Sequence, residues 1–515
     1  MSVSRKPKES IVISLPAPLG GWNARDSLAN MDPGDAVSLV NWFPGTSNVL
    51  MRYGYSDHVT GITGEQVESL MVWNGPTTSQ MIAATDAGKM YDTATAGAVG
   101  AAQVSGLTNG RWQHVNMSTT GGSYLIAVNG DDKAVIYNGT YHRDGDGAPY
   151  DVTGVNTADC INVNLHKNRL WFTQINTLDA WYMPTSAIGG AATKFSLNGV
   201  AQLGGSLVGM WTWTIDAGYG VDDMAAFVTN QGEVIVYSGT DPASASTWQL
   251  VGIWQIGTPV GYRCGLKYAG DLLLITQDGV QPMSGALQSS RLNPRVSVTD
   301  KIQAAMSAAI TNYGPNFGWE LVYFAQQNQL YLNVPVVEGS AQEQYVMNTI
   351  TKNWCNFTGW DANCWAILDD DLYFGSLGFI GKAWDTFADA GADVTGTAIQ
   401  AFNYLGNRSQ QKQFTMVRPT FFTAGGCSVF GGVNVDFDTS DISTSLQNVT
   451  PVGGSLWDAA VWDVDAWAPD LSPAAYWQGA QGIGYCCAPR IKATVNGTRI
   501  QWSATDVVFR RGAVL

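Results

Sequence analysis

The sequence predicts an all-β protein: a β-propeller of six or seven blades, preceded by an N-terminal strap and followed by a C-terminal β-sandwich-like domain. The first observation is composition, since 58 glycines and 11% aromatic residues accompany only 13% charged residues. This balance favours short strands joined by tight turns. The second is a recurring hairpin of two apolar runs around a polar or Gly-containing turn. The third is its spacing of roughly 45 to 55 residues, close to the length of one propeller blade.

The hairpins can be recognised one by one. Their Asn-Gly and Asp-Gly turns supply the positive φ that tight hairpins need. One such sheet cannot bury both of its faces, whereas a ring of sheets can, so the repeat favours a propeller over residues 61–390. Gly-His and Trp-Asp signatures do not recur with the repeat, which leaves six and seven blades open. The predicted strand pairs are 80–85 with 89–91, 124–128 with 134–137, 170–173 with 180–182, 224–228 with 234–237, 321–324 with 330–332, and 365–368 with 372–374, with a further hairpin over 272–279.

One short helix is expected near residues 299–310. Thr299 or Asp300 can cap it, and Asn312 and Gly314 end it. We expect it to pack on the outside of the ring or against a neighbouring subunit. Its apolar residues fall on a single stripe, made of Ile302, Ala305, Met306, Ala309 and Ile310.

Two segments of different character flank the propeller. Residues 1–60 begin with a short basic arm and continue as an extended strap with turns at Gly20-Gly21 and Pro33-Gly34. Residues 391–515 predict the C-terminal β-domain. Its expected strands are longer and lie at 398–405, 414–423, 427–437, 491–495, 499–503 and 507–510.

An acidic, aromatic loop is expected between these last strands, over residues 438–485. It contains Trp457, Trp462 and Trp467 at a constant step of five, each near an Asp. A step of five matches neither a strand face nor a helix face. The three indoles either fold down over their own loop or anchor an interface with another subunit or a fibre.

Charge and cysteine content limit the function further. The net charge of −15 makes the chain a poor sequence-independent binder of phosphate backbones. Such a surface suits either a wall past which DNA slides or simple solubility. The seven cysteines contain no Cys-x-x-Cys pair and predict buried thiols in a protein made in a reducing cytoplasm. The sequence contains no run of about 18 apolar residues, so it predicts no membrane span.

A catalytic or metal-binding constellation is not evident in the sequence. The four histidines show no metal-ligand spacing, and neither a phosphate-binding loop nor a serine nucleophile elbow occurs. The loop from His142 to Gly147 alternates carboxylates with glycines, but lacks the third carboxylate and closing Glu of a calcium loop. We therefore expect no enzyme activity, no cofactor and no metal, and we interpret this loop as a solvated hairpin tip.

The N-terminal strap carries the strongest resemblance to a known family. Residues 18–26 read Pro-Leu-Gly-Gly-Trp-Asn-Ala-Arg-Asp, followed by Met-Asp-Pro-Gly-Asp-Ala at 31–36, Asn-Trp-Phe-Pro-Gly at 41–45 and Arg-Tyr-Gly-Tyr at 52–55. This order resembles the opening of the tail nozzle (tail tubular) proteins of short-tailed bacteriophages, the podoviruses. The resemblance continues more loosely through residues 230–242 and 254–261 and the predicted helix.

The resemblance implies a structural virion protein: a homohexameric ring at the distal end of the tail that closes the DNA-ejection channel and later conducts the genome. It further implies contacts with a tail adaptor ring, tail fibres and the host cell surface, and double-stranded DNA passing through the lumen without specific binding. The chain would be made in the bacterial cytoplasm and reside in the virion tail. The expected interface residues are Trp22, Arg25, Trp42, Trp457, Trp462 and Trp467.

Two other classes of function remain open from the sequence. A β-propeller can carry a carbohydrate-active site, as in a sialidase or glycan depolymerase that uses carboxylates near the central axis. A propeller can also act as a protein-binding scaffold in the cell. Hydrolysis of a host polysaccharide would indicate the first, and a stable monomer would favour the second.

Overall fold

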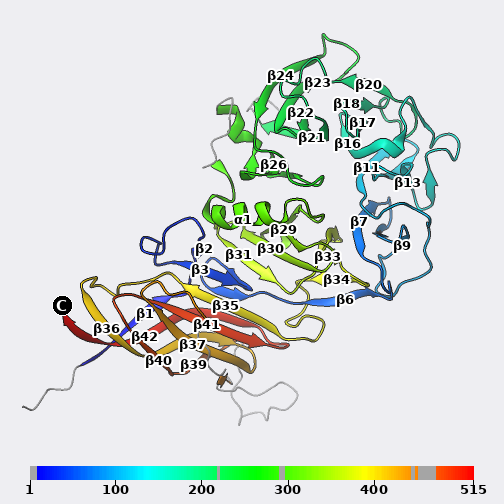
Figure 1. Ribbon diagram of the computed structural model, residues 1–515. Coiled ribbons are helices and arrows are strands. Elements are labelled where there is room, and N and C mark those ends of the chain that lie inside the picture. The colour runs from blue at the N-terminus through cyan, green and yellow to red at the C-terminus, as the bar shows by residue number, and fades with distance from the viewer. Residues whose placement is uncertain (1–8, 217–220, 289–295, 442–446, 450–470, 515) are drawn as a thin grey trace, which may run out of the picture.

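The computed structural model describes residues 9–216, 221–288, 296–441, 447–449 and 471–514. The chain forms a ring of sheets, the propeller, and a two-sheet β-domain beside it (Figure 1). The predicted all-β class is confirmed. The predicted helix is confirmed as well: a 3₁₀ turn, η4 (Asp300–Ile302), leads into α1 (Gln303–Tyr313).

The described residues form seven propeller blades, numbered in chain order. Blade 1 consists of β7 (Val67–Asn74), β8 (Ser79–Thr85) and β9 (Met90–Asp92). Blade 2 consists of β11 (Gln113–Thr119), β12 (Gly122–Val128), β13 (Val135–Tyr137) and β14 (Tyr141–Arg143). Blade 3 consists of β16 (Cys160–His166), β17 (Arg169–Gln174), β18 (Asp179–Tyr182) and β20 (Thr193–Ser196). Blade 4 consists of β21 (Leu207–Asp216), β22 (Val221–Thr229), β23 (Glu233–Gly239) and β24 (Trp248–Gln255). Blade 5 consists of β25 (Gly265–Tyr268), β26 (Asp271–Thr276) and β27 (Gly279–Pro282). Blade 6 consists of β28 (Glu320–Phe324), β29 (Gln329–Val337), β30 (Ala341–Asn348) and β31 (Trp354–Thr358).

Blade 7 closes the ring with strands from two distant parts of the chain. It combines β32 (Cys364–Leu368), β33 (Asp371–Gly375) and β34 (Phe379–Ala383) with β6 (Tyr55–Thr60). β6 runs antiparallel to β34, with Val59 opposite Ile380. The predicted hairpins are confirmed in all seven blades, and the blade number is the higher of the two expected.

The strands of the blades are apolar on both faces because each blade is covered on both sides. In β8, Met81 and Ala83 face the cluster that includes Ile380 of blade 7. Ile82 and Ala84 point the other way, into a cluster with Leu125 of blade 2. Successive strand residues face opposite sides, so a continuous apolar run lets one strand contribute to two inter-blade cores.

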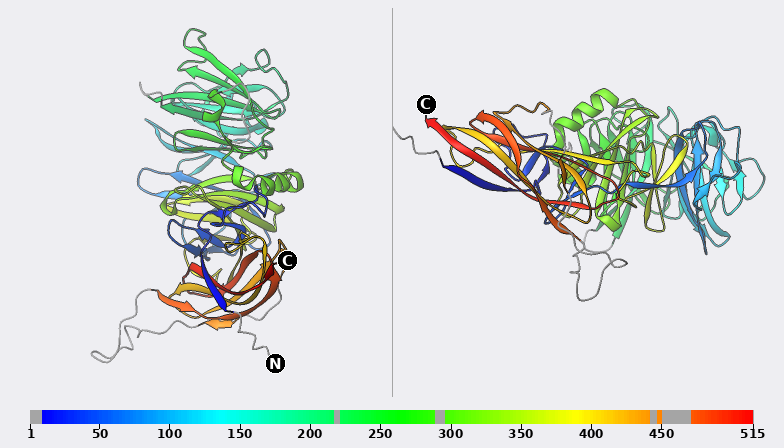
Figure 2. Two further views of the ribbon diagram at one scale, coloured as in Figure 1. Left: turned by 90° about the vertical axis from the view of Figure 1, so that its left-hand side faces the viewer. Right: turned by 90° about the horizontal axis from the view of Figure 1, so that it is seen from below.

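The second domain consists of two sheets packed face to face. One sheet contains β1 (Ser10–Pro16), β4 (Trp42–Pro44), β5 (Val49–Met51), β36 (Gln410–Thr423), β39 (Ser472–Ala475), β40 (Gln478–Gly484) and β42 (Ile500–Val514). The other contains β2 (Gly21–Trp22), β3 (Asp35–Val40), β35 (Val394–Gln400), β37 (Cys427–Val435), β38 (Gln447–Val449) and β41 (Cys487–Val495). Figure 2 shows β1 and β42 running side by side away from the propeller.

Several predicted features of this domain need correction. The strand expected at 398–405 lies at 394–400, and the two expected at 499–503 and 507–510 form the single strand β42. Part of the predicted 438–485 loop is regular, because β39 and β40 lie within it. Trp457, Trp462 and Trp467 lie outside the described residues.

The predicted strap is shared between the two domains. β1, β4 and β5 belong to one sheet of the sandwich, while β6 belongs to blade 7. β3 lies between β31 of blade 6 and β35 of the sandwich, pairing in parallel with β31 at Val40 and Asn356. One ten-stranded sheet therefore runs from blade 6 into the sandwich and joins the two domains through backbone hydrogen bonds.

Helix α1 packs against β27 and β29, between blades 5 and 6 (Figure 1). The predicted apolar stripe is confirmed: Met306 and Ala309 are buried, and Ala305 and Ile310 lie partly buried against the same core. The predicted end of the helix at Gly314 is confirmed, because Gly314 is the C-cap of α1, whereas the predicted N-terminal side-chain cap is wrong. In the described chain the side chain of Thr299 makes no capping hydrogen bond, because its hydroxyl accepts the N–H of Val280 (3.1 Å).

Trp42 is a core residue of the sandwich and not part of an exposed interface, which corrects its predicted role. Its side chain is fully buried. The indole stacks on Phe421 at 6.0 Å between ring centroids and contacts Trp502 at 5.7 Å. The sequence context alone, a Pro- and Gly-rich segment, does not distinguish an aromatic anchor that points inward from one that points outward.

We predict that Trp42→Ala destabilises the sandwich domain by about 3–5 kcal/mol, because the substitution opens a cavity between Phe421 and Trp502. Urea unfolding followed by circular dichroism measures the change. Ile483→Ala, on a side chain that is 60% exposed in the same domain, is the control and should change stability by less than about 0.5 kcal/mol. Equal effects of the two substitutions would contradict the core assignment.

Candidate functional site

The segment that resembles the nozzle proteins forms the joint between the two domains, beginning at Gly20 and Gly21. The Gly20 N–H donates to the carbonyl oxygen of Gly34 (2.8 Å), and a Cβ at Gly20 would lie 2.1 Å from Oδ1 of Asp35. Gly21 has φ +77°, and a Cβ there would lie 2.6 Å from the carbonyl oxygen of Trp354 in blade 6. Both positions require glycine because the strap approaches other backbone too closely for a side chain.

Asn23 organises the turn that follows. Its side chain is buried, and its amide donates to Asp35 Oδ2 (2.7 Å) and Asp26 Oδ2 (2.9 Å). Its Oδ1 accepts the backbone N–H groups of Arg25 and Asp26, both at 3.0 Å. The Arg25 guanidinium, and then the Asn23 amide, hold the pKa of Asp26 below its usual value. One asparagine thus holds both the turn and its carboxylates in place.

Lys301 connects this turn to the start of α1. Its Nζ donates to Asp35 Oδ1 (2.7 Å) and to the carbonyl oxygen of Gly20 (2.6 Å). Arg25 forms a second connection through an ion pair with Asp300. The predicted interface residue Arg25 is therefore paired within the chain, although its side chain remains 47% exposed.

Trp22 packs where the hydrophobic cores of the two domains meet. It is half-buried and lies against both cores. Its ring contacts Tyr345 of blade 6 edge to face, with centroids 5.1 Å apart. Trp22 therefore contributes to the joint, and its remaining exposed surface lies at the boundary between the domains.

Arg52 is the most completely buried charge of the joint. Its side chain is 1% exposed, and all five of its N–H donors are used. The guanidinium donates to both carboxylate oxygens of Asp389 (2.8 and 2.6 Å), to the carbonyl oxygens of Tyr53 and Thr358 (3.0 and 2.7 Å) and to Asn41 Oδ1 (2.9 Å). These partners belong to the strap, blade 6 and the segment between the domains, so one side chain ties three parts of the chain together.

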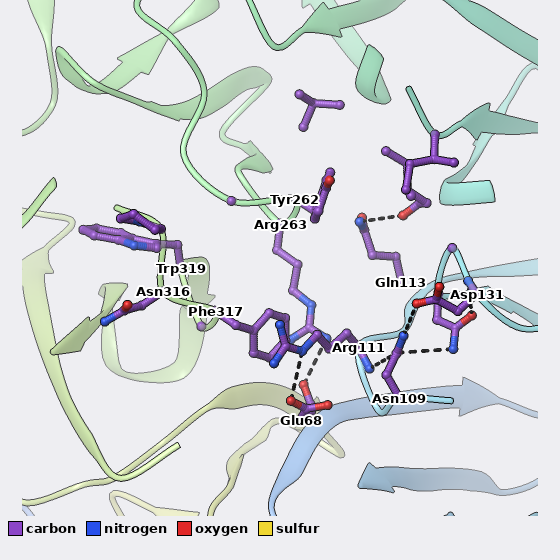
Figure 3. A pocket seen from close by; sticks show the side chains of 18 of the residues that line it. Glu68, Asn109, Arg111, Gln113, Asp131, Tyr262, Arg263, Asn316, Phe317 and Trp319 are labelled. Carbon is purple, nitrogen blue, oxygen red and sulfur yellow. Dashed lines mark hydrogen bonds and ion pairs between the residues drawn. The ribbon is translucent and has the colours of Figure 1, made fainter. Parts of the chain in front are cut away.

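A pocket of about 730 Å³ opens at the mouth of the propeller's central channel (Figure 3). It lies where the innermost strands of the blades begin, at Glu68 of blade 1, Gln113 of blade 2 and Val208 of blade 4. Asn129 and Asn230 reach it from hairpin turns. The side chains that line it therefore come from separate blades and are positioned by the ring as a whole.

Two arginines in this pocket are held by carboxylates and by one phenyl ring. Arg111 donates from Nε to Glu68 (3.0 Å) and from Nη2 to Glu338 (2.8 Å). Its guanidinium lies 4.4 Å from the ring centre of Phe317, and that of Arg263 lies 5.0 Å from the same centre. Cation–π contact thus adds to the ion pairs in fixing both arginines.

Arg263 spans the channel from its position just before β25. Its Nη2 donates to the carbonyl oxygens of Glu68 and Trp112, both at 3.0 Å, and to the hydroxyl of Ser69. Its Nη1 lies 3.7 Å from Glu320. Blade 5 is therefore connected across the axis to blades 1, 2 and 6, and the side chain obstructs the channel of the propeller itself.

Below Arg263, an inner cavity of about 200 Å³ holds two perturbed titratable groups. Burial, and secondarily Arg263, lower the pKa of His114 to about 4. Burial raises the pKa of Glu320 above its ordinary value, although Arg263 opposes the shift. Near neutral pH this level of the channel therefore contains a neutral imidazole close to Arg263 and Glu320.

The chemistry available to these groups is limited by their internal contacts. Glu68, the carboxylate at the mouth, accepts from Arg111 through one oxygen and from the Gly110 N–H (3.1 Å) through the other.

Among the described residues, no group of three or more His, Cys, Asp or Glu side chains is arranged to hold a metal ion. All seven cysteines are buried, as the sequence predicts. None of the helices described is long and apolar enough to cross a membrane.

The acidic loop after His142 has a structural role that explains its carboxylates. Asp144 accepts the Val152 N–H (2.8 Å), the Thr157 hydroxyl (2.6 Å) and Lys133 (3.0 Å). Burial disfavours its charge, but the Thr157 hydroxyl and then the other two donors outweigh burial and lower its pKa. Asp144 is therefore a buried hydrogen-bond acceptor and not part of a solvated hairpin tip.

The chain shares a distant structural similarity with solved proteins. No protein-family model and no curated protein matches the chain. Matching solved structures include a chain of the BBS1N–ARL6DN crystal structure, at 11% identity and TM-score 0.38, over 64% of this chain and 96% of that one. The β-propeller domain of Cps50 (Swd1) from Myceliophteria thermophila matches at 12% identity and TM-score 0.35, over 62% of this chain and 98% of its own.

Arg52 belongs to the Arg-Tyr-Gly-Tyr motif at 52–55, but nothing in the sequence indicates its partner. No sequence pattern pointed to Arg111, Arg263 or Phe317. The partners of Arg52 and Arg263 are up to 337 and 195 residues away in the chain, so no local pattern links them. One signal was available: in a chain with 13% charged residues, an arginine inside an aromatic segment is a candidate for burial.

We predict that Arg52→Met and Asp389→Asn each destabilise the protein by about 3–5 kcal/mol, because each leaves a buried charge or its hydrogen-bonding groups unpaired. Urea unfolding measures both, and the double variant should cost less than the sum of the two. Arg25→Ala is the control, since its exposed ion pairs contribute at most about 1 kcal/mol. If Arg52→Met lowered the free energy of unfolding no more than Arg25→Ala does, the buried pair would not be important for stability.

Asp144 provides a prediction about pH. Because its pKa is lowered in the folded state, its stabilising contribution is present above its unfolded pKa and is lost as pH falls through the folded value. Asp144→Asn should therefore be less stable than the native protein at pH 7, and the difference should narrow below about pH 4. Thermal unfolding across pH tests this, with exposed Asp369→Asn as the control. A pH-independent difference would contradict the lowered pKa.

Proposed function

We propose that this chain is a structural subunit of a short bacteriophage tail, forming the distal nozzle ring that closes and then conducts the DNA-ejection channel. One observation carries the proposal: the segments that resemble the nozzle proteins, 18–26, 31–36, 41–45 and 52–55, are the ones that build the joint. Gly20, Asn23 and Arg52 each make contacts there that few other residue types can make. The resemblance therefore follows a specific structural device and not a shared composition.

The charge and the channel geometry support a conduit formed between subunits. Arg263 and its partners obstruct the channel of the propeller itself. Double-stranded DNA would therefore pass through a lumen enclosed by six copies of the chain. A net charge of −15 suits such a wall, because an acidic surface neutralises few phosphates, releases few counterions from DNA and therefore holds it weakly.

The remaining partners follow from the place of a nozzle in the tail. The ring would contact an adaptor ring above it, tail fibres at its side and the host cell surface below it. Its action would be mechanical, since the shared ten-stranded sheet and the buried Arg52–Asp389 pair make each subunit rigid across its two domains. A rigid subunit transmits a displacement at the host surface to the far side of the ring.

A non-enzymatic role fits the channel better than glycan hydrolysis does. Glycosidases need one carboxyl group as acid and a second as base or nucleophile, both facing the substrate. Both oxygens of Glu68 are engaged, and Glu320 lies beneath Arg263 beside that guanidinium. Glu68 and Glu320 therefore hold the blades together and are not free to act on a substrate.

We predict that the purified protein forms six-fold rings of six times 55.2 kDa, visible by negative-stain electron microscopy and measurable by native mass spectrometry. Trp22→Ala should reduce the fraction of chains in rings while the β-sheet circular dichroism persists, because the substitution loosens the joint between two folded domains. A monomer that hydrolyses polysaccharide would refute the nozzle, and intact rings of Trp22→Ala would refute the role of the strap.

A further inference from the structure

The pocket at the channel mouth has the size and enclosure of a ligand site. Its volume of about 730 Å³ lies within the usual range of roughly 300–1,000 Å³ for small-molecule sites. Because its lining comes from several blades and their turns, closing the ring forms the pocket without further movement. What it binds depends on which of its groups remain available.

The two arginines of the pocket are already paired with carboxylates within the protein. Arg111 pairs with Glu68 and Glu338, and Arg263 lies beside Glu320. Both guanidiniums also lie over the Phe317 ring. A phosphate or carboxylate ligand would have to displace these carboxylates from the arginines, so an anionic ligand is disfavoured.

The groups that remain are amide side chains and two carboxylates, Asp86 and Asp131, on a fixed scaffold. Asn109 Nδ2 donates to Asp131 Oδ2 (2.6 Å), and Asn109 Oδ1 accepts from Asn129 (3.2 Å) and from the Arg111 N–H (2.8 Å). Gln113 and Asn230 add two further amides to the lining. Amides and a carboxylate held by one another form a preorganised set of donors and acceptors for hydroxyl groups.

Tyr262 provides an aromatic surface at the same site. It lines the pocket, and it is 53% exposed, unlike the buried Trp319 nearby (Figure 3). The Phe317 ring is occupied by two guanidiniums, so Tyr262 is the aromatic face accessible to a ligand. A half-exposed tyrosine above a polar pocket can cover the apolar face of a ring that also carries several hydroxyl groups.

We propose that this pocket binds a neutral saccharide, one or two hexose units long. The ring hydroxyls would bond with the amides around Asn109 and with Asp131, and one sugar face would lie on Tyr262. The inference is independent of the nozzle proposal, since it concerns a pocket inside each single propeller.

The test is ligand-observed saturation-transfer NMR and calorimetry on the full-length protein. The neutral probes are glucose, galactose, N-acetylglucosamine and their β-1,4-linked disaccharides, each up to about 10 mM, a range suited to millimolar affinity. Inorganic phosphate and N-acetyl-arginine amide serve as anionic and cationic probes. We expect at least one neutral sugar to bind and both charged probes to bind more weakly.

Variants at the rim locate the site. Tyr262→Ala should weaken binding of that sugar by about tenfold, whereas Tyr262→Phe, which keeps the ring, should stay within about threefold of the native protein. Ile483→Ala, in the other domain, is the control and should bind as the native protein does. Absence of neutral-sugar binding, preference for either charged probe, or equal binding by Tyr262→Ala would each overturn the proposal.

Discussion

The buried pair of Arg52 and Asp389 is the interaction on which the arrangement of the two domains depends. Arg52 lies between β5 and β6, at the point where the chain leaves the sandwich and enters blade 7. Asp389 lies where the chain returns from β34 toward β35. The pair therefore holds the outgoing and returning crossings of one boundary together. The bidentate geometry sets orientation as well as distance, which a flexible lysine would not.

The structural features that the sequence predicts correctly are those whose contacts are local in the chain. The hairpins were predictable because an apolar run, an Asn-Gly or Asp-Gly turn and the returning run lie within about twenty residues, and propeller blades are made of such units. The apolar stripe of helix α1 was also predictable, because its residues lie close together in the sequence. The pairing of β6 with β34 was not, since Val59 and Ile380 share no pattern that links them. That pairing completes blade 7 and closes the ring.

The site residues were harder to predict because their function depends on position in space. Trp42 and Trp22 have similar sequence surroundings, yet the first is enclosed by Phe421 and Trp502 and the second lies half-buried at a boundary. Arg263 resembles any surface arginine in the sequence. It becomes a brace across the channel only because seven sheets close into a ring. Residues whose role is created by ring closure leave little trace in a linear pattern.

The pairing of β1 with β42 has a consequence for biosynthesis. Ser10 lies opposite Arg510, so β1 leaves the ribosome long before the strand with which it pairs. Until then its backbone hydrogen-bonding groups remain open, and folding must wait for a contact of very high sequence separation. A prematurely terminated chain cannot complete the sandwich. In the proposed nozzle ring, the pairing of β1 with β42 would keep incomplete subunits from being incorporated.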